Sequence, residues 1–287
     1  MRTIIGVDIG GSHISAAQIN WNSGSIQLSN FYEADVDTSG SVDEIIDAWS
    51  EVIKKVANGK QAIQLGIAMP GPFDYEQGIS LIQEQGKLKS LYGLSVKDLL
   101  AQSISIDSEF ILFLNDAEAF LRGESMVGAG KKYSNLMGLT LGTGLGSAIQ
   151  VEEVVKDAKL WTAPFRDGIA EDYLGTAWFI GEAKKQYGLE IEGVRDLLAP
   201  EVDSEISRSI FQKFGNTLGE FLFPYVSRLQ TESVIVGGKI SNASKFFLPF
   251  TQTYLERMGL ELTCKKSELG ENASLIGSVQ PFFKNLT

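Results

Sequence analysis

Two segments of the chain repeat one pattern that could hold a phosphate: an apolar run, a glycine-rich break and a second apolar run. They are IIGVDIGGSHISAAQI at residues 4–19 and LMGLTLGTGLGSAIQV at residues 136–151. Each predicts a β-hairpin whose turn carries few side chains, so phosphate oxygens could approach the amides and the backbone could take positive φ. One such turn alone would favour an ordinary hairpin, but the repetition indicates two similar halves that clamp one polyphosphate.

The candidate phosphate-binding residues are the glycines of these turns and the polar side chains beside them: Gly10, Gly11, Ser12, His13, Gly142, Thr143, Gly144 and Gly146. Hydroxyl groups can donate to phosphate oxygens, whereas His13 could either touch phosphate or decorate the turn. The carboxylate of Asp8 makes sense beside a phosphate mainly when a divalent cation lies between them. A dinucleotide fingerprint fits poorly, because both turns run into strand-like sequence and not into a helix.

The elements around the turns predict a sheet whose carboxyl edge carries polar groups. A helix is expected at residues 41–56, with Ser41 and Glu44 as a capping box. Buried strands follow at residues 62–69, 109–116 and 232–238, and ligand sites in such sheets lie beyond the carboxyl ends of the strands.

Asp116 ends one of these strands and is our candidate for a general base. A carboxylate there could accept the proton of an attacking hydroxyl. Asp116 also immediately precedes the helical segment AEAFLRGE, so the alternative is a helix N-cap. The two phosphate turns favour the role of base.

Composition excludes several classes of function. Among 287 residues, 36 Asp and Glu outweigh 25 Lys and Arg, giving a net charge of -11, so nucleic acid and anionic membranes are not expected partners. The single cysteine, Cys264, and the single histidine, His13, leave no basis for a structural zinc site. With no signal-like or membrane-length apolar run, a cytoplasmic protein is expected.

Six motifs in order resemble those of the ROK family, a branch of the actin-like sugar-kinase superfamily. They are DIGGSHISAA, GIAMPGPFD, LNDAEAFLRGE, LTLGTGLGSA, VIVGGKIS and ENASLIGSV. The resemblance implies an α/β protein of two similar domains with the ribonuclease H-like or actin-like ATPase fold and the active site in the cleft between them. The domains would comprise residues 1–114 plus about 275–287, and residues 115–274.

The resemblance also assigns roles at the site. It implies ATP and Mg²⁺ as cofactors, with Asp8 steering Mg²⁺ through water and Asp116 as general base. The residues expected to line the sugar and adenosine sites are Pro70, Gly71, Asn115, Asp116 and Glu171 for the sugar, and Gly237 and Gly238 for adenosine. Ala273 and Gly277 would be small so that helices can pack closely. By the same analogy, the chain could form a homodimer.

The chain departs from the family after the second turn. Typical members carry a GEIGH-like segment and a cysteine-rich zinc loop, whereas this chain has WTAPFRDGIAEDYLG. Glu171 resembles a further sugar-contacting carboxylate, or it is a glutamate placed favourably at a helix N-terminus. Arg166 could select an anionic substrate, although a solvated surface arginine is the simpler interpretation.

Three functions remain open on the sequence. The first is phosphorylation of a hexose or N-acetylhexosamine hydroxyl in the manner of a glucokinase. The second is a sugar or nucleotide sensor acting through protein partners, and the third is an actin-like ATPase of another kind. The retained Asp8, Asp116 and glycine turns favour the kinase, since a sensor needs no base.

Overall fold

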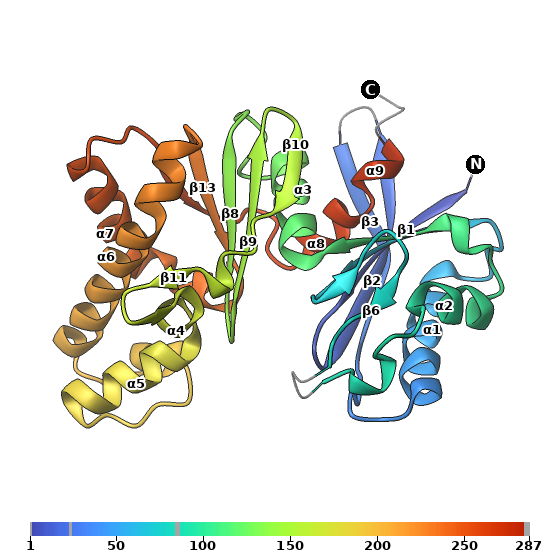
Figure 1. The fold of residues 1–287 in the computed structure, drawn as a ribbon, viewed down its shortest axis with the longest axis horizontal. Helices are drawn as coiled ribbons and strands as arrows, with labels where there is room; N and C mark the ends of the chain where they lie inside the picture. The colour runs from blue at the N-terminus through green and yellow to red at the C-terminus, as the bar shows by residue number, and fades with distance from the viewer. Residues whose placement is uncertain (1, 23–24, 84–86, 284–287) are drawn as a thin grey trace. The chain divides into compact units, whose positions relative to one another are not determined.

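The computed structural model describes residues 2–22, 25–83 and 87–283, which form two compact units (Figure 1). Unit 1 comprises residues 1–127 and 271–287, and unit 2 comprises residues 128–270. Each unit has its own sheet and its own hydrophobic core. We describe them separately.

The sheet of unit 1 has the order β3-β2-β1-β4-β7. Its strands are β1 (Thr3–Ile9), β2 (His13–Asn22), β3 (Ser25–Asp35), β4 (Ile63–Met69) and β7 (Ile111–Asn115). The first three strands are antiparallel neighbours, and β4 and β7 add parallel to β1. The hairpin expected at residues 4–19 is confirmed as β1 and β2.

Helices cover the two faces of this sheet (Figure 1). They are α1 (Val42–Ala57), α2 (Val96–Ile104), α3 (Asp116–Val127), α8 (Asn272–Ser278) and α9 (Gln280–Phe283), with a small β5 (Phe73–Asp74) and β6 (Ile79–Ser80) ribbon before α2. The capping box of α1 is confirmed: the Glu44 amide donates to Ser41 Oγ, and the Ser41 amide donates to Glu44 Oε2 at 2.8 Å. The buried face of α1, including Trp49, packs into the core of the unit.

Helix α8 lies unusually close to its neighbours because glycines face it. A methyl group on Gly6 of β1 would lie 2.1 Å from the Leu275 carbonyl oxygen of α8. A methyl group on Gly277 of α8 would lie 1.7 Å from the Ala119 carbonyl oxygen of α3, and one on Gly123 would lie 2.1 Å from the Ala273 oxygen. These contacts confirm that Gly277 is small for close packing.

The sheet of unit 2 repeats the plan of unit 1 in the order β10-β9-β8-β13-β14. Its strands are β8 (Leu136–Leu141), β9 (Leu145–Val151), β10 (Val154–Asp157), β13 (Ser233–Gly237) and β14 (Thr263–Lys266). As in unit 1, a three-stranded antiparallel part is followed by two parallel strands. The second expected hairpin is therefore confirmed as β8 and β9.

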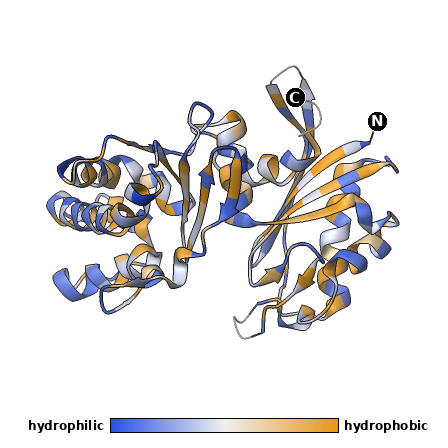
Figure 2. Ribbon diagram, turned by 45° about the horizontal axis from the view of Figure 1, so that its top comes forward, coloured by the Kyte–Doolittle hydropathy of each residue, from blue (hydrophilic) through white to orange (hydrophobic). Residues whose placement is uncertain are grey.

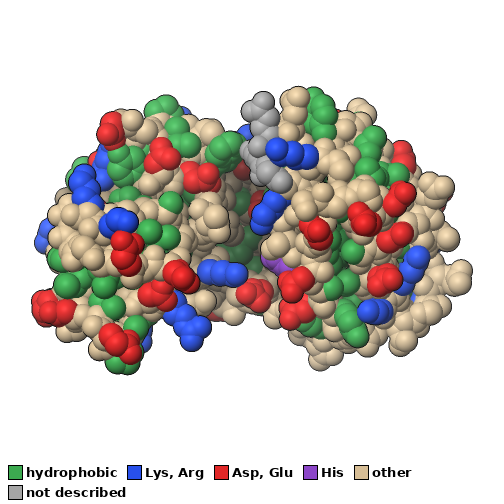
Figure 3. Space-filling view, turned by 90° about the horizontal axis from the view of Figure 1, so that it is seen from below, with side chains coloured by type: hydrophobic (Ala, Val, Ile, Leu, Met, Phe, Trp, Pro, Cys, Tyr) green, Lys and Arg blue, Asp and Glu red, His purple; other side chains and the backbone are tan. Residues whose placement is uncertain are grey.

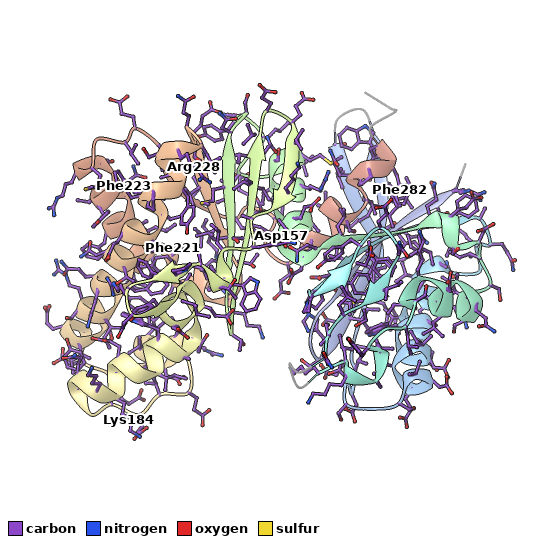
Figure 4. The ribbon with its side chains drawn as sticks, in the orientation of Figure 1. Asp157, Lys184, Phe221, Phe223, Arg228 and Phe282 are labelled. Atoms are coloured by element: carbon purple, nitrogen blue, oxygen red, sulfur yellow. The ribbon has the colours of Figure 1, made fainter. Side chains whose placement is uncertain are left out.

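The helices of unit 2 enclose an aromatic core. They are α4 (Ala170–Leu174), α5 (Thr176–Tyr187), α6 (Ser204–Arg228) and α7 (Ser244–Arg257), and a short β11 (Pro164–Phe165) and β12 (Gly168–Ile169) ribbon precedes α4. Phe221 of α6 is buried, with its ring 5.4 Å from that of Phe165, while Phe223 packs at the edge of the core (both phenylalanines are labelled in Figure 4). Apolar colour follows the strands of both sheets in Figure 2, as expected for sheets covered by helices.

The boundary between the units differs from the sequence expectation. Residues 115–127 and 271–274, which the sequence analysis placed in the second domain, group with unit 1. The physical reason is the close packing of α3 against α8, which holds both helices on the sheet of unit 1.

Charged side chains are spread over both units. On the face drawn in Figure 3, acidic and basic side chains are interspersed. Within the described ranges, none of the helices has the length and apolar character needed to cross a membrane.

Candidate active site

The first glycine turn, between β1 and β2, is tight and held from one side. The Gly10 amide donates to the His13 carbonyl at 2.9 Å, which closes the turn over Gly11 and Ser12. The segment after β3 braces it: the Val36 amide donates to the Ser12 carbonyl at 2.9 Å, and the hydroxyl of Thr38 donates to the Gly11 carbonyl at 2.7 Å. The turn is therefore fixed in shape by the protein itself.

Side chains lie against the glycines of this turn. A methyl group on Gly10 would lie 2.3 Å from the His13 imidazole, and one on Gly11 would lie 2.9 Å from Cδ of Lys87. Glycine could take positive φ in these turns, but Gly10, Gly11, Gly142 and Gly144 all lie outside the left-handed region. The bare backbone leaves room for neighbouring groups.

The second glycine turn, between β8 and β9, is braced by the segment around α4 and α5. The backbone amide and the hydroxyl of Thr176 both donate to the Gly142 carbonyl at 2.9 Å. Glu171 Oε2 accepts from the Leu145 amide at 2.9 Å, and a methyl group on Gly144 would lie 2.4 Å from that oxygen. Each turn is thus fixed by a threonine hydroxyl that donates to a glycine carbonyl.

Gly146 and Thr143, both predicted for the second phosphate loop, lie in different elements. Gly146 lies within β9 and pairs with Thr140, so it belongs to the strand and not to the turn. Thr143 lies in the turn, where its carbonyl oxygen faces the Gly175 backbone.

The polar residues of unit 1 gather at one edge of its sheet. Asp8 is in register with Ala68, and Met69 with Asn115, so the parallel strands β1, β4 and β7 end together. Asp8, the Pro70–Gly71 segment and Asn115 with Asp116 therefore share the carboxyl edge, as the sequence predicted.

The Asn115 side chain is hydrogen-bonded through both its oxygen and its nitrogen at this edge. It is 8% exposed, and its Oδ1 accepts from the amides of Ala117 at 3.0 Å and Glu118 at 3.2 Å. Its Nδ2 donates to the Tyr75 hydroxyl at 3.1 Å, and that hydroxyl donates to the Met69 carbonyl at 3.1 Å. Asn115 thus caps α3 and ties it to the end of β4.

Asp116 is the first residue of α3, and its Oδ1 accepts from the Ala117 amide at 2.9 Å. The capping role foreseen for this aspartate is therefore shared with Asn115. Since Asn115 already satisfies the amides of Ala117 and Glu118, the helix start does not depend on Asp116 alone.

The carboxylates of unit 1 influence one another. Burial, together with the negative charges of Asp116 and Glu271, raises the pKa of Asp8 from 3.8 to about 7. Such a concentration of negative charge is what a divalent cation neutralises, so the residues present fit a cation beside Asp8. Within the described part of the chain, no group of three or more Asp, Glu, His and Cys side chains is arranged to enclose a metal ion directly.

The two glycines expected to line an adenosine site lie at the matching edge of unit 2. Gly238 follows β13 with φ of 77°, and a methyl group there would lie 2.4 Å from the Leu141 carbonyl oxygen at the end of β8. Gly237 pairs with Thr140 in the parallel ladder. The Gly237–Gly238 pair and the second glycine turn therefore share the carboxyl edge of this sheet.

The segment that replaces the family's zinc loop is held by side-chain contacts. Arg166 pairs with Glu220 at 2.5 Å, and its guanidinium carbon lies 5.1 Å from the ring centroid of Phe165 and 5.2 Å from that of Tyr173. Arg166 is exposed, as expected for a surface arginine, and Glu220 is its ion-pair partner there. The hydroxyl of Tyr173, in α4, donates to Asp167 in the turn between β11 and β12.

Sequence reasoning missed the bracing residues, namely Thr38, Tyr75, Thr176, Lys87 and Glu271. Glu271 begins the motif ENASLIGSV and Tyr75 follows Pro70–Gly71 closely, but no spacing in the sequence assigns the contacts that these five residues make. Hydroxyls shortly after a strand, as at Thr38, are the one weak signal that was available.

Two units of one topology, each with a glycine turn between its first two strands, define the actin-like ATPase fold. Solved structures share it. The glucokinase of Streptomyces griseus, solved with glucose and AMPPNP, is 20% identical with a TM-score of 0.77, covering 97% of this chain and 98% of that one. The ROK hexokinase of Thermus thermophilus is 18% identical with a TM-score of 0.77, covering 96% of each chain.

The chain belongs to the ROK family, whose model matches residues 4–159. Among curated proteins, the glucokinase of Thermotoga maritima is 30% identical over 169 residues, which are 59% of this chain and 49% of that protein. The chain therefore spans about half the length of the curated relatives that it matches.

Proposed function

We propose that this chain is an ATP- and Mg²⁺-dependent sugar kinase that phosphorylates a hydroxyl of a hexose or N-acetylhexosamine. Membership of the ROK family supports a sugar-related activity. The match to a protein named glucokinase, and the fold shared with a glucokinase solved with glucose and an ATP analogue, support the reaction class.

One observation carries the proposal: Asp116 stands beside Asp8 at the carboxyl edge of the unit 1 sheet. The charge of Asp116 raises the pKa of Asp8, so the two carboxylates are electrostatic neighbours. Two carboxylates in distinct environments can divide the work, one accepting a proton and one facing a cation. A protein that only senses a ligand has no need of that pair.

In the proposed reaction, the oxygen of a sugar hydroxyl attacks the γ-phosphorus of ATP. The new bond joins that oxygen to phosphorus, the bond from phosphorus to the β,γ-bridging oxygen breaks, and ADP leaves. The Asp116 carboxylate takes the hydroxyl proton. When bound, Mg²⁺ would neutralise the charge on the phosphates, and Asp8 would hold its hydration shell.

The remaining residues orient the reactants in this proposal. Both glycine turns donate amides to phosphate oxygens, with Ser12 and Thr143 adding hydroxyls. The Gly237–Gly238 pair lies against adenosine. Pro70, Gly71, Asn115 and Glu171 face the sugar.

The test is ADP release from Mg²⁺-ATP across a panel of hexoses, hexosamines and N-acetylhexosamines, with Asp116→Asn measured alongside. Loss of a general base costs about 10²–10⁴ in rate, so we expect the variant to lose that much sugar-stimulated turnover. Its nucleotide affinity should stay within about twofold of the native value, because the carboxylate is assigned to the sugar hydroxyl.

Asp98→Asn is the matched control, because Asp98 is an exposed aspartate in the first turn of another helix of unit 1, α2. Its turnover should match the native chain. Turnover retained by Asp116→Asn removes Asp116 from the role of base. ATP binding without turnover on any sugar would instead favour the sensor.

A further inference from the structure

Lys87 lies over the first glycine turn. An added methyl group on Gly11 would lie 2.9 Å from Cδ of Lys87 and 3.2 Å from its Nζ, so the side chain runs across the bare face of that glycine. The residue itself is exposed, and no ion pair found among the described residues uses it. The ammonium group is therefore a positive charge at the turn that is assigned to phosphate.

The backbone fixes the position of Lys87. The next residue, Leu88, is 1% exposed, and its amide donates to the Thr38 carbonyl at 2.9 Å. The Thr38 hydroxyl donates in turn to the Gly11 carbonyl at 2.7 Å. Thr38 therefore joins the lysine segment to the glycine turn through both its backbone and its side chain.

Leu88 strengthens this placement. Its φ of 58° lies in the left-handed region, which a branched side chain rarely adopts. Such a backbone persists when the surroundings over-determine it, and here the side chain is buried in the core of unit 1. The backbone beside Lys87 is therefore held in place, and the lysine side chain lies over Gly11 from this fixed point.

The negative charge near this turn gives a physical reason for a lysine there. In unit 1, Asp8 at this edge lies close enough to Asp116 and Glu271 to feel the negative charge of both. A phosphate that approaches this edge needs positive charge from the protein as well as from a cation, and a lysine supplies it as a mobile point charge.

We propose that Lys87 binds the terminal phosphate of the phosphate donor at the first glycine turn. This inference rests on the proposed kinase function. Lys87 would touch an oxygen of the phosphoryl group in transit, where charge spreads over three equatorial oxygens. The ammonium would strengthen binding of a triphosphate more than binding of a diphosphate.

The test compares Lys87→Met with Lys87→Arg and with Lys89→Met. Methionine keeps the length of the side chain and removes the charge, whereas arginine keeps the charge. Lys89 is an exposed lysine two positions further along the chain, so its variant controls for loss of a surface charge. Calorimetry with Mg²⁺ would measure the affinity for a non-hydrolysable ATP analogue and for ADP.

We expect Lys87→Met to bind the ATP analogue about tenfold or more weakly, as for a lost charged hydrogen bond, and to bind ADP within about threefold of the native value. Lys87→Arg should keep most of the affinity, and Lys89→Met all of it. The preference for triphosphate over diphosphate should also fall with rising salt in the native chain and not in Lys87→Met.

Several results would overturn the inference. Equal affinity of Lys87→Met and Lys89→Met for the analogue would do so, as would equal losses for the analogue and ADP. A rise confined to the KM for sugar would place the lysine at the acceptor instead. If Lys87→Met unfolds, Lys87→Gln takes its place in the same comparison.

The same measurements distinguish failure of the proposed kinase function from failure of the Lys87 inference. A native chain that binds the analogue yet phosphorylates no sugar refutes the kinase, while the Lys87 comparison still decides the role of the lysine. A native chain that binds no analogue refutes both.

Discussion

Replacing Asp8 by asparagine should stabilise the protein while destroying its proposed activity. Burial and two neighbouring carboxylates raise the pKa of Asp8 from 3.8 to about 7 in the folded state. The folded chain therefore holds this proton to higher pH than the unfolded chain does. Between these two values the folded state binds more protons, so the free energy of unfolding falls as the pH rises.

The magnitude follows from the displaced pKa. A change in the pKa from 3.8 to about 7 lowers the free energy of unfolding at high pH by at most about 4 kcal/mol, at about 1.4 kcal/mol per pKa unit. Between pH 5 and pH 8 the linkage relation gives a growth of roughly 2–3 kcal/mol in the penalty. Asparagine does not ionise, so its advantage over Asp8 should grow by that amount across the same interval.

Urea unfolding at pH 5 and pH 8, in metal-free buffer, would measure the difference between Asp8→Asn and the native chain. Asp98→Asn again serves as the control, because Asp98 is exposed and its replacement should leave the pH dependence unchanged. A difference between Asp8→Asn and the native chain that does not grow from pH 5 to pH 8 would refute the assignment of a raised pKa to Asp8. A variant that keeps full kinase turnover would refute its role beside the cation.

Two further pairs of substitutions test the packing and the second turn. Gly277→Ala places a methyl group 1.7 Å from the Ala119 oxygen, so we expect a loss of more than about 3 kcal/mol in urea unfolding. Gly181→Ala, in α5 with open space around it, should gain about 0.5–1 kcal/mol, and equal effects of the two would contradict the close approach of α3 and α8. Glu171→Ala removes the acceptor of the Leu145 amide and should weaken binding of an ATP analogue roughly threefold to tenfold, while Glu171→Gln keeps an acceptor and most of the affinity. An unchanged nucleotide affinity with a raised KM for sugar would assign Glu171 to the sugar alone.

Local signals in the sequence predict much of this fold because local and tertiary preferences agree. The repeated hairpins follow from apolar runs on both sides of a glycine break, and Ser41 with Glu44 marks the start of α1. The carboxyl-edge position of Asn115 and Asp116 follows from a buried strand that leads directly into a helix. These features depend on neighbours in the chain.

Features that depend on distant segments were not predictable. The unit boundary was placed too early because the contact of α3 with α8 joins residues about 150 positions apart, and only the small size of Gly123 and Gly277 allows it. The contacts of Lys87 with the first turn and of Glu171 with the second were not predictable for the same reason, because both residues come from elsewhere in the chain. Arg166 finds Glu220 on α6, a partner that no local spacing indicates.

Sugar-stimulated ADP release by the native chain and by Asp116→Asn tests the central claim most directly. The account predicts that at least one hexose or N-acetylhexosamine stimulates release, and that Asp116→Asn loses this stimulation while it still binds the nucleotide. Equal turnover in the two proteins would contradict the assignment of Asp116. Nucleotide binding with no response to any sugar would contradict the kinase itself.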